Sequence, residues 1–327
     1  MRECQAQGRE RDTFKSERLL RNQDDVKKAK FQFIDAHKDR WSVSAMCRVL
    51  EVTRQGYYQW TVRPISAHDE RDFEISCAMI PLWEKLNSCY GAPKMVLELR
   101  KAGIRASKKR VARLMSESGM AGTCGVGLKK PGAPKEKSET DNAEDLVKRD
   151  FEADGPNRAW FADITYVKTY QGWLYVAVVI DIWSRMVVGW AMGPRIDAAL
   201  ADDALRMAIA RRCPSSGLIH HSDHGSQYRS LLLGKTMREH GIRPSMGSVA
   251  SPWDNAPTES FMGILKRECV HRKTFETREQ AQLEIFEYIE AFYNRLRMHS
   301  ALGFMSPMEF EEKMTKKEDV GKAATAA

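Results

Sequence analysis

The chain has 327 residues, 43% hydrophobic and 29% charged, which is enough apolar material for about two domains and excludes a disordered or fibrous protein for most of its length. A membrane span is also excluded, because the longest stretch without Asp, Glu, Lys or Arg, Thr169–Ile180, has 12 residues against the ~20 that a span needs. The net charge of +8 lies wholly in residues 1–150, where 30 Lys and Arg face 22 Asp and Glu, and this excess favours a polyanionic partner such as nucleic acid.

The cysteines and the N-terminus favour a reducing interior. The seven cysteines are scattered and never form a Cys-x-x-Cys pair, so we expect neither a disulfide framework nor a cysteine zinc site. The first 15 residues contain no apolar stretch of the kind found in secretory signals. We therefore expect a cytoplasmic protein.

The first two segments are predicted to be helical. Residues 1–30 are charged and favour a helical extension, whereas residues 31–62 have the rhythm of a helix-turn-helix DNA-binding unit. In that unit Ser42 or Ser44 can cap the first helix and Thr53 the second. The second helix then begins with Arg54 and Gln55, side chains that suit base-edge recognition. From these residues alone, a plain helical hairpin is an equally good interpretation.

Residues 63–120 are predicted to form a second, basic unit of the same kind. The helix Pro93–Lys101 ends at Ala102-Gly103, and Ser107 can cap the helix Lys108–Glu117. The basic side chains of that second helix suit DNA phosphates, although a solvated surface would look the same; they are Lys108, Lys109, Arg110 and Arg113. Residues 121–150 are rich in Gly, Pro and Lys and are predicted to be a flexible linker.

The second half, residues 151–312, is predicted to be an α/β domain, followed by a disordered tail at 313–327. Three apolar strands in hairpin connection come first, and helices alternate with short strands after them, an order typical of a mixed sheet covered by helices. The predicted strands are Arg158–Thr169, Trp173–Ile182, Met186–Met192, Gly217–Asp223 and 242–247, and the helices are Asp197–Cys213, 229–241, 257–270 and 277–297.

Three carboxylates in this domain stand out. Asp163 interrupts an apolar strand, Asp223 lies where a short strand ends, and Glu259 lies near the start of the helix opened by Pro257. Taken singly, such an acid is more often a salt-bridge partner or a helix cap. Together they could hold Mg²⁺, which prefers carboxylate oxygens, and two such ions can drive phosphoryl transfer.

The residues around these acids carry a family resemblance. The motifs are W-x-x-D-I-T-Y, H-S-D-H-G-S-Q-Y and W-D-N-A-x-x-E-S-F, with 35 residues between Asp223 and Glu259 and with Lys266 seven residues beyond Glu259. They resemble the DDE motif of bacterial insertion-sequence transposases of the IS-three family, OrfB type, whose catalytic domain is similar to retroviral integrase. The resemblance covers about residues 31–310 and includes a C-terminal signature: Tyr293-Asn294, Arg297, His299-Ser300, Leu302-Gly303, Ser306-Pro307 and Phe310.

The resemblance implies a ribonuclease-H-like mixed-sheet catalytic core, the integrase catalytic domain, preceded by small all-α helix-turn-helix units. It places Asp163 on the first strand, Asp223 just after the fourth and Glu259 on a later helix, with all three holding Mg²⁺, for which Mn²⁺ would substitute. It implies cleavage of the element's ends with water as the nucleophile, after which the freed 3′-hydroxyl attacks another DNA phosphodiester. Lys266 would hold a DNA phosphate beside the metals.

The resemblance also implies partners and a location. We expect double-stranded DNA, as terminal inverted repeats and target DNA, a homo-oligomer on that DNA, and an OrfA-type partner or a frame-shifted OrfA–OrfB fusion. We expect a bacterial cytoplasmic protein associated with the nucleoid. Residues 1–30 lie outside the match.

Several further residues receive supporting or competing interpretations. Asp181, an acid in the adjacent strand, is the nearest rival of Asp163, but we expect it to support the structure. Asn255 is assigned to DNA contact, with capping or orienting Glu259 as alternatives. A zinc site at His220, His221 and His224 is disfavoured because neighbouring strand residues face opposite sides. Supporting roles are predicted for His221, Tyr293, Asn294, Arg297 and His299.

Two other functions fit part of the sequence. A nuclease on the same ribonuclease-H-like fold would have no evident need for two helical DNA-binding units. A catalytically inactive DNA-binding remnant, acting as a repressor, would not need the acidic triad and Lys266. The transposase is therefore the favoured function.

Overall fold

The computed structural model describes residues 26–62, 66–123, 146–147, 153–223, 225, 227–247 and 255–325. The chain divides into two compact units, Met1–Phe73 and Glu74–Ala327. In the described parts of both units, no helix is long and apolar enough to cross a membrane.

The first unit is a small helical assembly. A helix at residues 26–37 precedes α2 (Val43–Val49) and α3 (Arg54–Val62). Both predicted caps are confirmed, because the Ser42 hydroxyl accepts a hydrogen bond from Ala45 N and the Thr53 hydroxyl accepts one from Gly56 N. A compact core holds the helices together and consists of Ile34, Met46, Cys47 and Tyr57.

The second unit begins with helices. The helix α4 (Ala67–Lys85) crosses the boundary between the units, and α5 (Ala92–Lys101) and α6 (Lys108–Glu117) follow within a residue of their predicted bounds. Gly103, with φ +82°, follows the end of α5, and Ser107 caps α6 through Arg110 N. The stretch predicted to be a linker lies almost entirely outside the described residues.

A five-stranded mixed sheet forms the centre of the part of the second unit that begins at residue 153. Its strands are β1 (Ala159–Thr169), β2 (Gly172–Asp181), β3 (Val187–Gly193), β4 (Ile219–Ser222) and β5 (Arg243–Met246). Their order is β3-β2-β1-β4-β5, with antiparallel pairing of β2 to both neighbours and parallel pairing from β1 through β4 to β5. This is the mixed sheet that the order of elements predicted, and it agrees with the ribonuclease-H-like core that the family resemblance implied.

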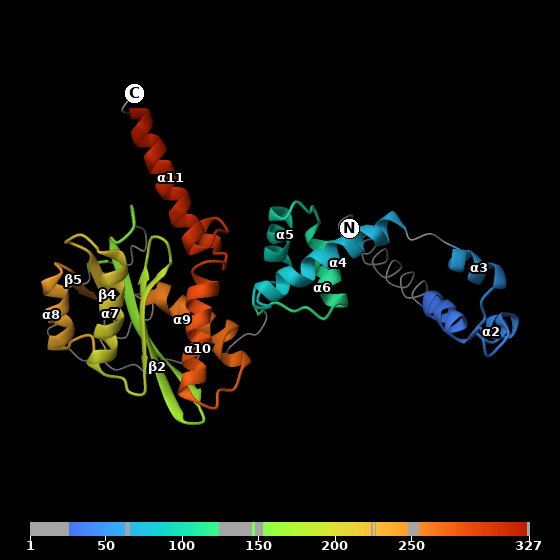
Figure 1. Cartoon of the computed structure of the whole chain (residues 1–327), viewed down its shortest axis with the longest axis horizontal. Coiled ribbons are helices and arrows are strands. Elements are labelled where there is room, and N and C mark those ends of the chain that lie inside the picture. Colours follow the sequence, from blue (N-terminus) through green and yellow to red (C-terminus); the bar gives the residue numbers. More distant parts are fainter. Residues whose placement is uncertain are drawn as a thin grey trace, which may run out of the picture. The chain divides into compact units, whose positions relative to one another are not determined.

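Helices cover both faces of this sheet, as Figure 1 shows. On one face lie α7 (Ala198–Arg212) and α8 (Leu231–Glu239), and on the other α9 (Ala256–Glu268) and α10 (Arg278–Glu287). The strands serve both layers because alternate side chains face opposite sides: Val176 and Val178 join the α9 layer, and Ala177 and Val179 the α7 layer. Both cores are therefore built from one run of apolar residues.

The C-terminal segment differs from its prediction in two places. The single helix predicted at 277–297 is instead α10 followed by a π-helical turn, Tyr288–Tyr293. The predicted disordered tail is wrong for most of its length, because α11 (Pro307–Thr325) continues through it. Glu, Lys and Ala are good helix formers, and their abundance in this segment offers a physical reason for the helix.

Candidate active site

The candidate site lies where β4 leaves the edge of β1. The short β4 pairs with β1 only at Ala159–Phe161, so among the described residues no strand continues along that edge from Ala162 onward, and only an isolated bridge between Thr169 and Phe275 follows. Asn255, at the start of α9, donates a hydrogen bond of 3.1 Å from Nδ2 to the Ala162 carbonyl. Asp163 is the next residue of β1, Asp223 directly follows β4, and Glu259 lies in the first turn of α9.

The three acids and Lys266 share one electrostatic environment. The pKa of Asp163 is raised to about 7, chiefly by burial and then by the charges of Asp223 and Glu259. The Ile164 N–H, which donates to Asp163 Oδ1 at 2.8 Å, and the charge of Lys266 act in the opposite direction. Negative charge is thus crowded at this edge, with one lysine nearby.

The carboxylates are close without forming a closed cluster. Among the described residues, the oxygens of Asp163, Asp223 and Glu259 do not all lie within 4.8 Å of one another. Asp163 is half-buried in β1, whereas Asp223 and Glu259 are exposed. Exposed side chains can rotate, so these two carboxylates are able to approach a common cation.

Two hydrogen bonds between side chains and the backbone hold the turn after β4. Gly225 N donates to Asp223 Oδ1 at 3.0 Å, and the Ser222 hydroxyl donates to the Asp223 carbonyl at 3.2 Å. A Cβ at Gly225 would meet Asp223 Oδ1 and the end of the Gln227 side chain, so a larger residue there would displace these side chains. His224, one member of the disfavoured zinc triad, lies outside the described residues.

Tyr228 is a neighbour of the acids to which sequence reasoning assigned no role. Its ring is buried, and its hydroxyl has no hydrogen-bond partner among the described residues. Burial, followed by the charges of Asp163 and Asp223, raises the pKa of Tyr228 well above its usual value. Its place five residues after Asp223, in H-S-D-H-G-S-Q-Y, was the available signal.

Of the two residues predicted to contact DNA beside the acids, Lys266 has surroundings that fit this role and Asn255 does not. Lys266 Nζ lies 5.0 Å from the centre of the Tyr166 ring, and its charge acts on Asp163, as a phosphate ligand beside the acids would require. Asn255, assigned to DNA contact, is 8% exposed and bonded to the Ala162 carbonyl. The structure therefore does not support the DNA contact and favours its alternative, orientation of the helix that carries Glu259.

Asp181 has a structural environment of its own. It is fully buried and accepts hydrogen bonds from Asn157 N at 2.8 Å and Trp183 N at 3.0 Å, with Arg212 at 3.4 Å. Burial is the main cause of the raised pKa of Asp181, which these partners lower. These contacts fit the predicted supporting role.

The two described histidines of β4 face opposite sides, as predicted. The His220 ring lies beside Tyr228, with centroids 6.3 Å apart, whereas the His221 ring lies 4.9 Å from that of Phe161 and its Nδ1 is 2.9 Å from the Ser245 hydroxyl. Burial lowers the pKa of His220 to about 4, so its ring is neutral near pH 7. This arrangement argues against shared zinc ligation.

The C-terminal signature residues brace the core. The Tyr293 hydroxyl donates to the Arg185 carbonyl at 3.2 Å, and the Asn294 amide exchanges two hydrogen bonds of 3.0 Å with the backbone of Val187. Arg297 binds both carboxylate oxygens of Glu268 at 2.8 Å, and its Nη1 lies 3.4 Å from His299 Nε2. No sequence pattern marked Glu268 as the partner of Arg297.

The predicted DNA-contacting side chains lie on helix surfaces. Arg54 and Gln55 are exposed in the first turn of α3, and Lys108 and Lys109 are exposed in the first turn of α6. Further along α6, Arg110 is half-buried. Arg113 forms an ion pair of 3.0 Å with Glu117.

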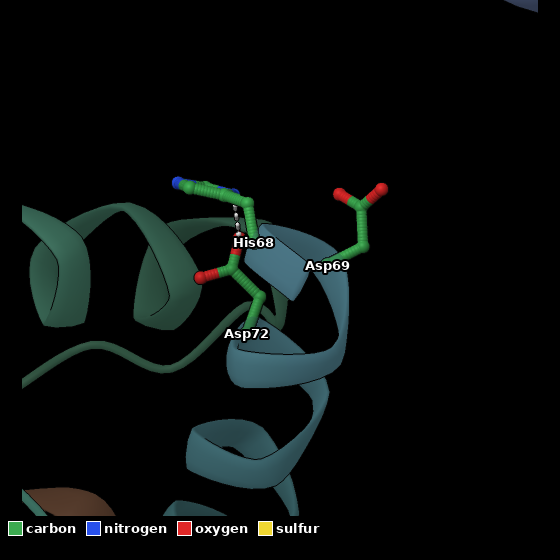
Figure 2. A group of neighbouring side chains, drawn as sticks. All are labelled: His68, Asp69 and Asp72. Atoms are coloured by element: carbon green, nitrogen blue, oxygen red, sulfur yellow. Dashed lines mark ion pairs between the residues drawn. The ribbon is translucent and has the colours of Figure 1, made fainter. Parts of the chain in front are cut away.

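A different cluster of possible metal ligands belongs to a helix start. In the described parts of the chain, His68, Asp69 and Asp72 each place one ligand atom within 4.8 Å of the others. Figure 2 shows that Asp72 faces His68, to which it is paired at 3.4 Å, while the Asp69 carboxylate lies apart. Asp69 instead accepts a hydrogen bond from the Ser66 hydroxyl, so the cluster is accounted for by capping and pairing within α4.

Comparison with known protein families identifies both halves of the second unit. Models described as "Integrase core domain" match residues 153–252 and 259–314, and one described as "HTH-like domain" matches residues 70–125.

Curated relatives cover most of the chain. It is 40% identical over 291 residues to "Transposase InsF for insertion sequence IS3A" of Escherichia coli (strain K12), a match that spans 87% of this chain and 99% of that protein. It is 37% identical over 268 residues to "Insertion element IS600 uncharacterized 31 kDa protein" of Shigella sonnei, spanning 82% of this chain and 98% of that protein.

Solved structures give more distant matches. The HTLV-2 integrase catalytic core domain in complex with magnesium (trimeric form) matches with a TM-score of 0.39 and 16% identity, over 48% of this chain and 97% of that one. A chain of the simian T-cell lymphotropic virus intasome in complex with PP2A regulatory subunit B56 gamma matches with a TM-score of 0.41 and 17% identity, over 66% of this chain and 70% of that one.

Proposed function

The chain belongs to the IS3 family of insertion-sequence transposases, enzymes with an integrase core, and we propose that its DNA chemistry takes place at Asp163, Asp223 and Glu259 with Mg²⁺ as cofactor. In this proposal the enzyme cleaves the ends of its element and joins each freed 3′-hydroxyl to another DNA phosphodiester. The observation that carries the assignment is the placement of the three acids at one edge of β1, where burial first and then the charges of Asp223 and Glu259 raise the pKa of Asp163 to about 7.

The residues present fit a divalent cation. The donor set consists of carboxylate oxygens from three separate elements, the ligand chemistry that Mg²⁺ prefers, and Mn²⁺ would substitute. Burial, and after it the charges of Asp223 and Glu259, disfavours the ionised form of Asp163, and a bound cation would stabilise that form. When bound, the metal would activate the attacking oxygen and stabilise the leaving one.

The chain's own residues would position the reaction. Asn255 holds the start of α9 against β1 and so sets the approach of Glu259 to Asp163. Lys266 would bind a DNA phosphate beside the acids, and the Tyr228 hydroxyl would donate a hydrogen bond to Asp163 or Asp223. Water and the DNA 3′-hydroxyl are the nucleophiles, so no protein nucleophile is required.

DNA recognition would come from the helical units. We propose that Arg54 and Gln55 read base edges, and that Lys108, Lys109 and their neighbours on α6 contact phosphates. Cleavage and joining at two ends further suggest a homo-oligomer on DNA. An OrfA-type partner or a fused OrfA–OrfB form is proposed from the family resemblance alone.

The direct test uses a labelled duplex that carries the element's own end, incubated with Mg²⁺ or with EDTA. The wild type is compared with Glu259→Gln and with Glu312→Gln, a matched variant at an exposed position of α11. We expect Mg²⁺-dependent joining in the wild type and in Glu312→Gln, and none in Glu259→Gln. Joining that persists in Glu259→Gln would overturn the site assignment.

A wild type that binds the duplex without joining would require the fused OrfA–OrfB form to be tested. Joining by that form would show that the chain needs an OrfA-type partner. Continued inactivity would favour the alternative of a catalytically inactive DNA-binding repressor. Cleavage of an RNA–DNA hybrid without strand joining would favour the nuclease.

A further inference from the structure

A basic hollow lies beside the first turns of α9. Its volume is about 390 Å³, and its wall includes Lys94 of α5, Arg185 of the turn between β2 and β3, and Arg297 and His299 of the C-terminal segment. No Asp or Glu is among the described residues that line it. The wall is therefore positively charged, and an anion is the complementary ligand.

Arg185 is the cation of this wall with the weakest charge compensation. Its backbone has φ +60°, and its carbonyl is fixed by the Tyr293 hydroxyl at 3.2 Å. Within the described residues, no carboxylate lies within ion-pair distance of its guanidinium. Burial lowers the pKa of Arg185, as expected for a cation removed from water without a counter-charge. Because Arg185 is half-buried, part of this cost remains in the free protein, and a bound anion would offset it.

The other polar groups of the wall are already oriented. Lys94 Nζ donates to the Met298 carbonyl at 2.9 Å and lies 4.8 Å from the centre of the Tyr90 ring. Arg297 is neutralised by Glu268, and because arginine can only donate, His299 Nε2 must accept from it. The neutral His299 ring therefore carries its proton on Nδ1, which is a hydrogen-bond donor.

The hollow is close to the catalytic carboxylates. Ala256, Ser260 and Ile264, one turn apart on α9, line it, while Glu259 projects from the adjoining side of the same helix. A helix is about 10 Å across, so an anion here would lie roughly that far from Glu259. At an axial rise of about 3.4 Å per nucleotide, this distance corresponds to two or three nucleotides of one DNA strand.

We propose that this hollow binds a backbone phosphate of the DNA strand held in the active site, two or three nucleotides from the bond that is cut. The proposal rests on the proposed function, because it assumes that DNA occupies the carboxylate site. The wall combines Lys94, from the segment matched as HTH-like, with Arg185, Arg297 and His299 from the integrase-core half. One phosphate would thus contact both segments and couple DNA binding by the helical segment to placement of the strand for chemistry.

The test measures binding of the full chain to the element's end in EDTA, so that no cleavage takes place. One phosphate at a time is replaced by an uncharged methylphosphonate around the cleavage site. The protein is the wild type, Arg185→Gln, Lys94→Gln or Arg238→Gln, the last a matched loss of charge at an exposed position of α8. The melting temperature of each variant establishes that it is folded.

We expect one methylphosphonate position at which wild-type affinity falls roughly tenfold, the effect of one lost charge-assisted contact. Arg185→Gln and Lys94→Gln should bind unmodified DNA more weakly than the wild type does. The methylphosphonate at that position should cause no further loss of affinity in these two variants. Arg238→Gln should keep the full loss there. The salt dependence of binding should also fall by about one phosphate contact for Arg185→Gln.

If the loss of affinity from the methylphosphonate added to the loss from the substitution at every position, for both Arg185→Gln and Lys94→Gln, the proposal would be overturned. If inorganic phosphate stabilised the wild type but not Arg185→Gln while the DNA losses remained additive, the hollow would take free phosphate, which also overturns it. The proposed function fails separately. If the variants lost sensitivity to the one methylphosphonate in EDTA but the wild type showed no Mg²⁺-dependent joining, the proposed strand joining would be contradicted. The proposed phosphate site would still hold.

Discussion

Asn255 and Ala162 are joined by a buried hydrogen bond of 3.1 Å between the side-chain amide and the main-chain carbonyl. The bond links the residue before Asp163 to the start of the helix that carries Glu259. It uses a carbonyl that no strand occupies, because β4 pairs only with Ala159–Phe161. The edge of β1 just beyond its pairing with β4 is thus where the start of α9 is attached to the sheet, next to Asp163.

Replacing Asn255 with Ala should lower strand joining while DNA binding is kept. Loss of the amide frees the start of α9, so Glu259 would no longer be held at a fixed approach to Asp163. Losses of about 10–100-fold are typical when a residue that orients a metal ligand is removed. The measurement is the joining rate at saturating DNA, with affinity determined separately in EDTA.

Asn255→Asp is the companion variant, because it keeps the size of the side chain but removes the donor. It should lose joining as Asn255→Ala does. Unchanged joining rates in both variants would show that the hydrogen bond does not position the site.

Mg²⁺ binding should depend on pH through Asp163. In the protein without metal the pKa of Asp163 is about 7, raised from 3.8, and a cation binds only the ionised carboxylate. Below pH 7 the affinity should therefore fall about tenfold per pH unit, and above pH 8 it should level off. Calorimetric titration with Mg²⁺ from pH 5.5 to 8.5 measures this.

Asp163→Asn provides the control for that titration, because it cannot ionise. It should bind Mg²⁺ more weakly and lose the pH dependence centred near 7. A wild-type affinity that stayed constant between pH 6 and 8 would contradict the raised pKa.

Local signals in the sequence account for most of the secondary structure. Hydroxyl caps such as Ser42 and Ser107 lie within three residues of the N–H groups that they satisfy, and the apolar run of β2 is continuous. The acids were placed by local motifs and by a family resemblance, and the structure brings Asp163, Asp223 and Glu259 to one edge. Asp223 and Glu259 lie where an element ends or begins, whereas Asp163 is conspicuous as an acid inside an apolar strand.

Contacts between residues far apart in the chain could not be predicted from local sequence patterns. Glu268 and Arg297 are 29 residues apart, and nothing local distinguishes Glu268 from the exposed acids around it. The burial of Asn255 depends on an unpaired carbonyl 93 residues earlier in the chain. The hollow at Arg185 draws its wall from segments between Lys94 and Ala301. Only the packed fold brings such groups together.

The buried Glu268–Arg297 pair should be important for stability. Both side chains are less than 10% exposed, and Tyr288 also donates to Glu268 Oε2 at 2.8 Å. Glu268→Gln would leave the Arg297 cation buried without a counter-charge, and we expect about 3–5 kcal/mol less free energy of unfolding. Denaturant unfolding measures the loss.

The exposed Arg113–Glu117 pair is the matched control for that variant. Glu117→Gln should cost about 1 kcal/mol or less, because a solvent-exposed ion pair contributes little. Equal losses in the two variants would mean that burial does not strengthen the dependence on the Glu268 charge.

His220 should make the fold less stable in mild acid. The pKa of its buried ring is about 4 in the folded chain against 6.5 for an unperturbed histidine. Between these two values the unfolded chain binds a proton that the folded chain does not, so this contribution to the free energy of unfolding falls as pH falls. From pH 7 to pH 5 the decrease should be about 2 kcal/mol.

The comparison that isolates this effect is urea unfolding of the wild type and His220→Gln at both pH values. The stability of the wild type relative to the variant should drop by about 2 kcal/mol on going to pH 5. His271→Gln, at an exposed position, should leave that pH dependence in place. If the wild type and His220→Gln lost stability in parallel, the ring at position 220 would have to accept its proton in the folded state near the ordinary pKa.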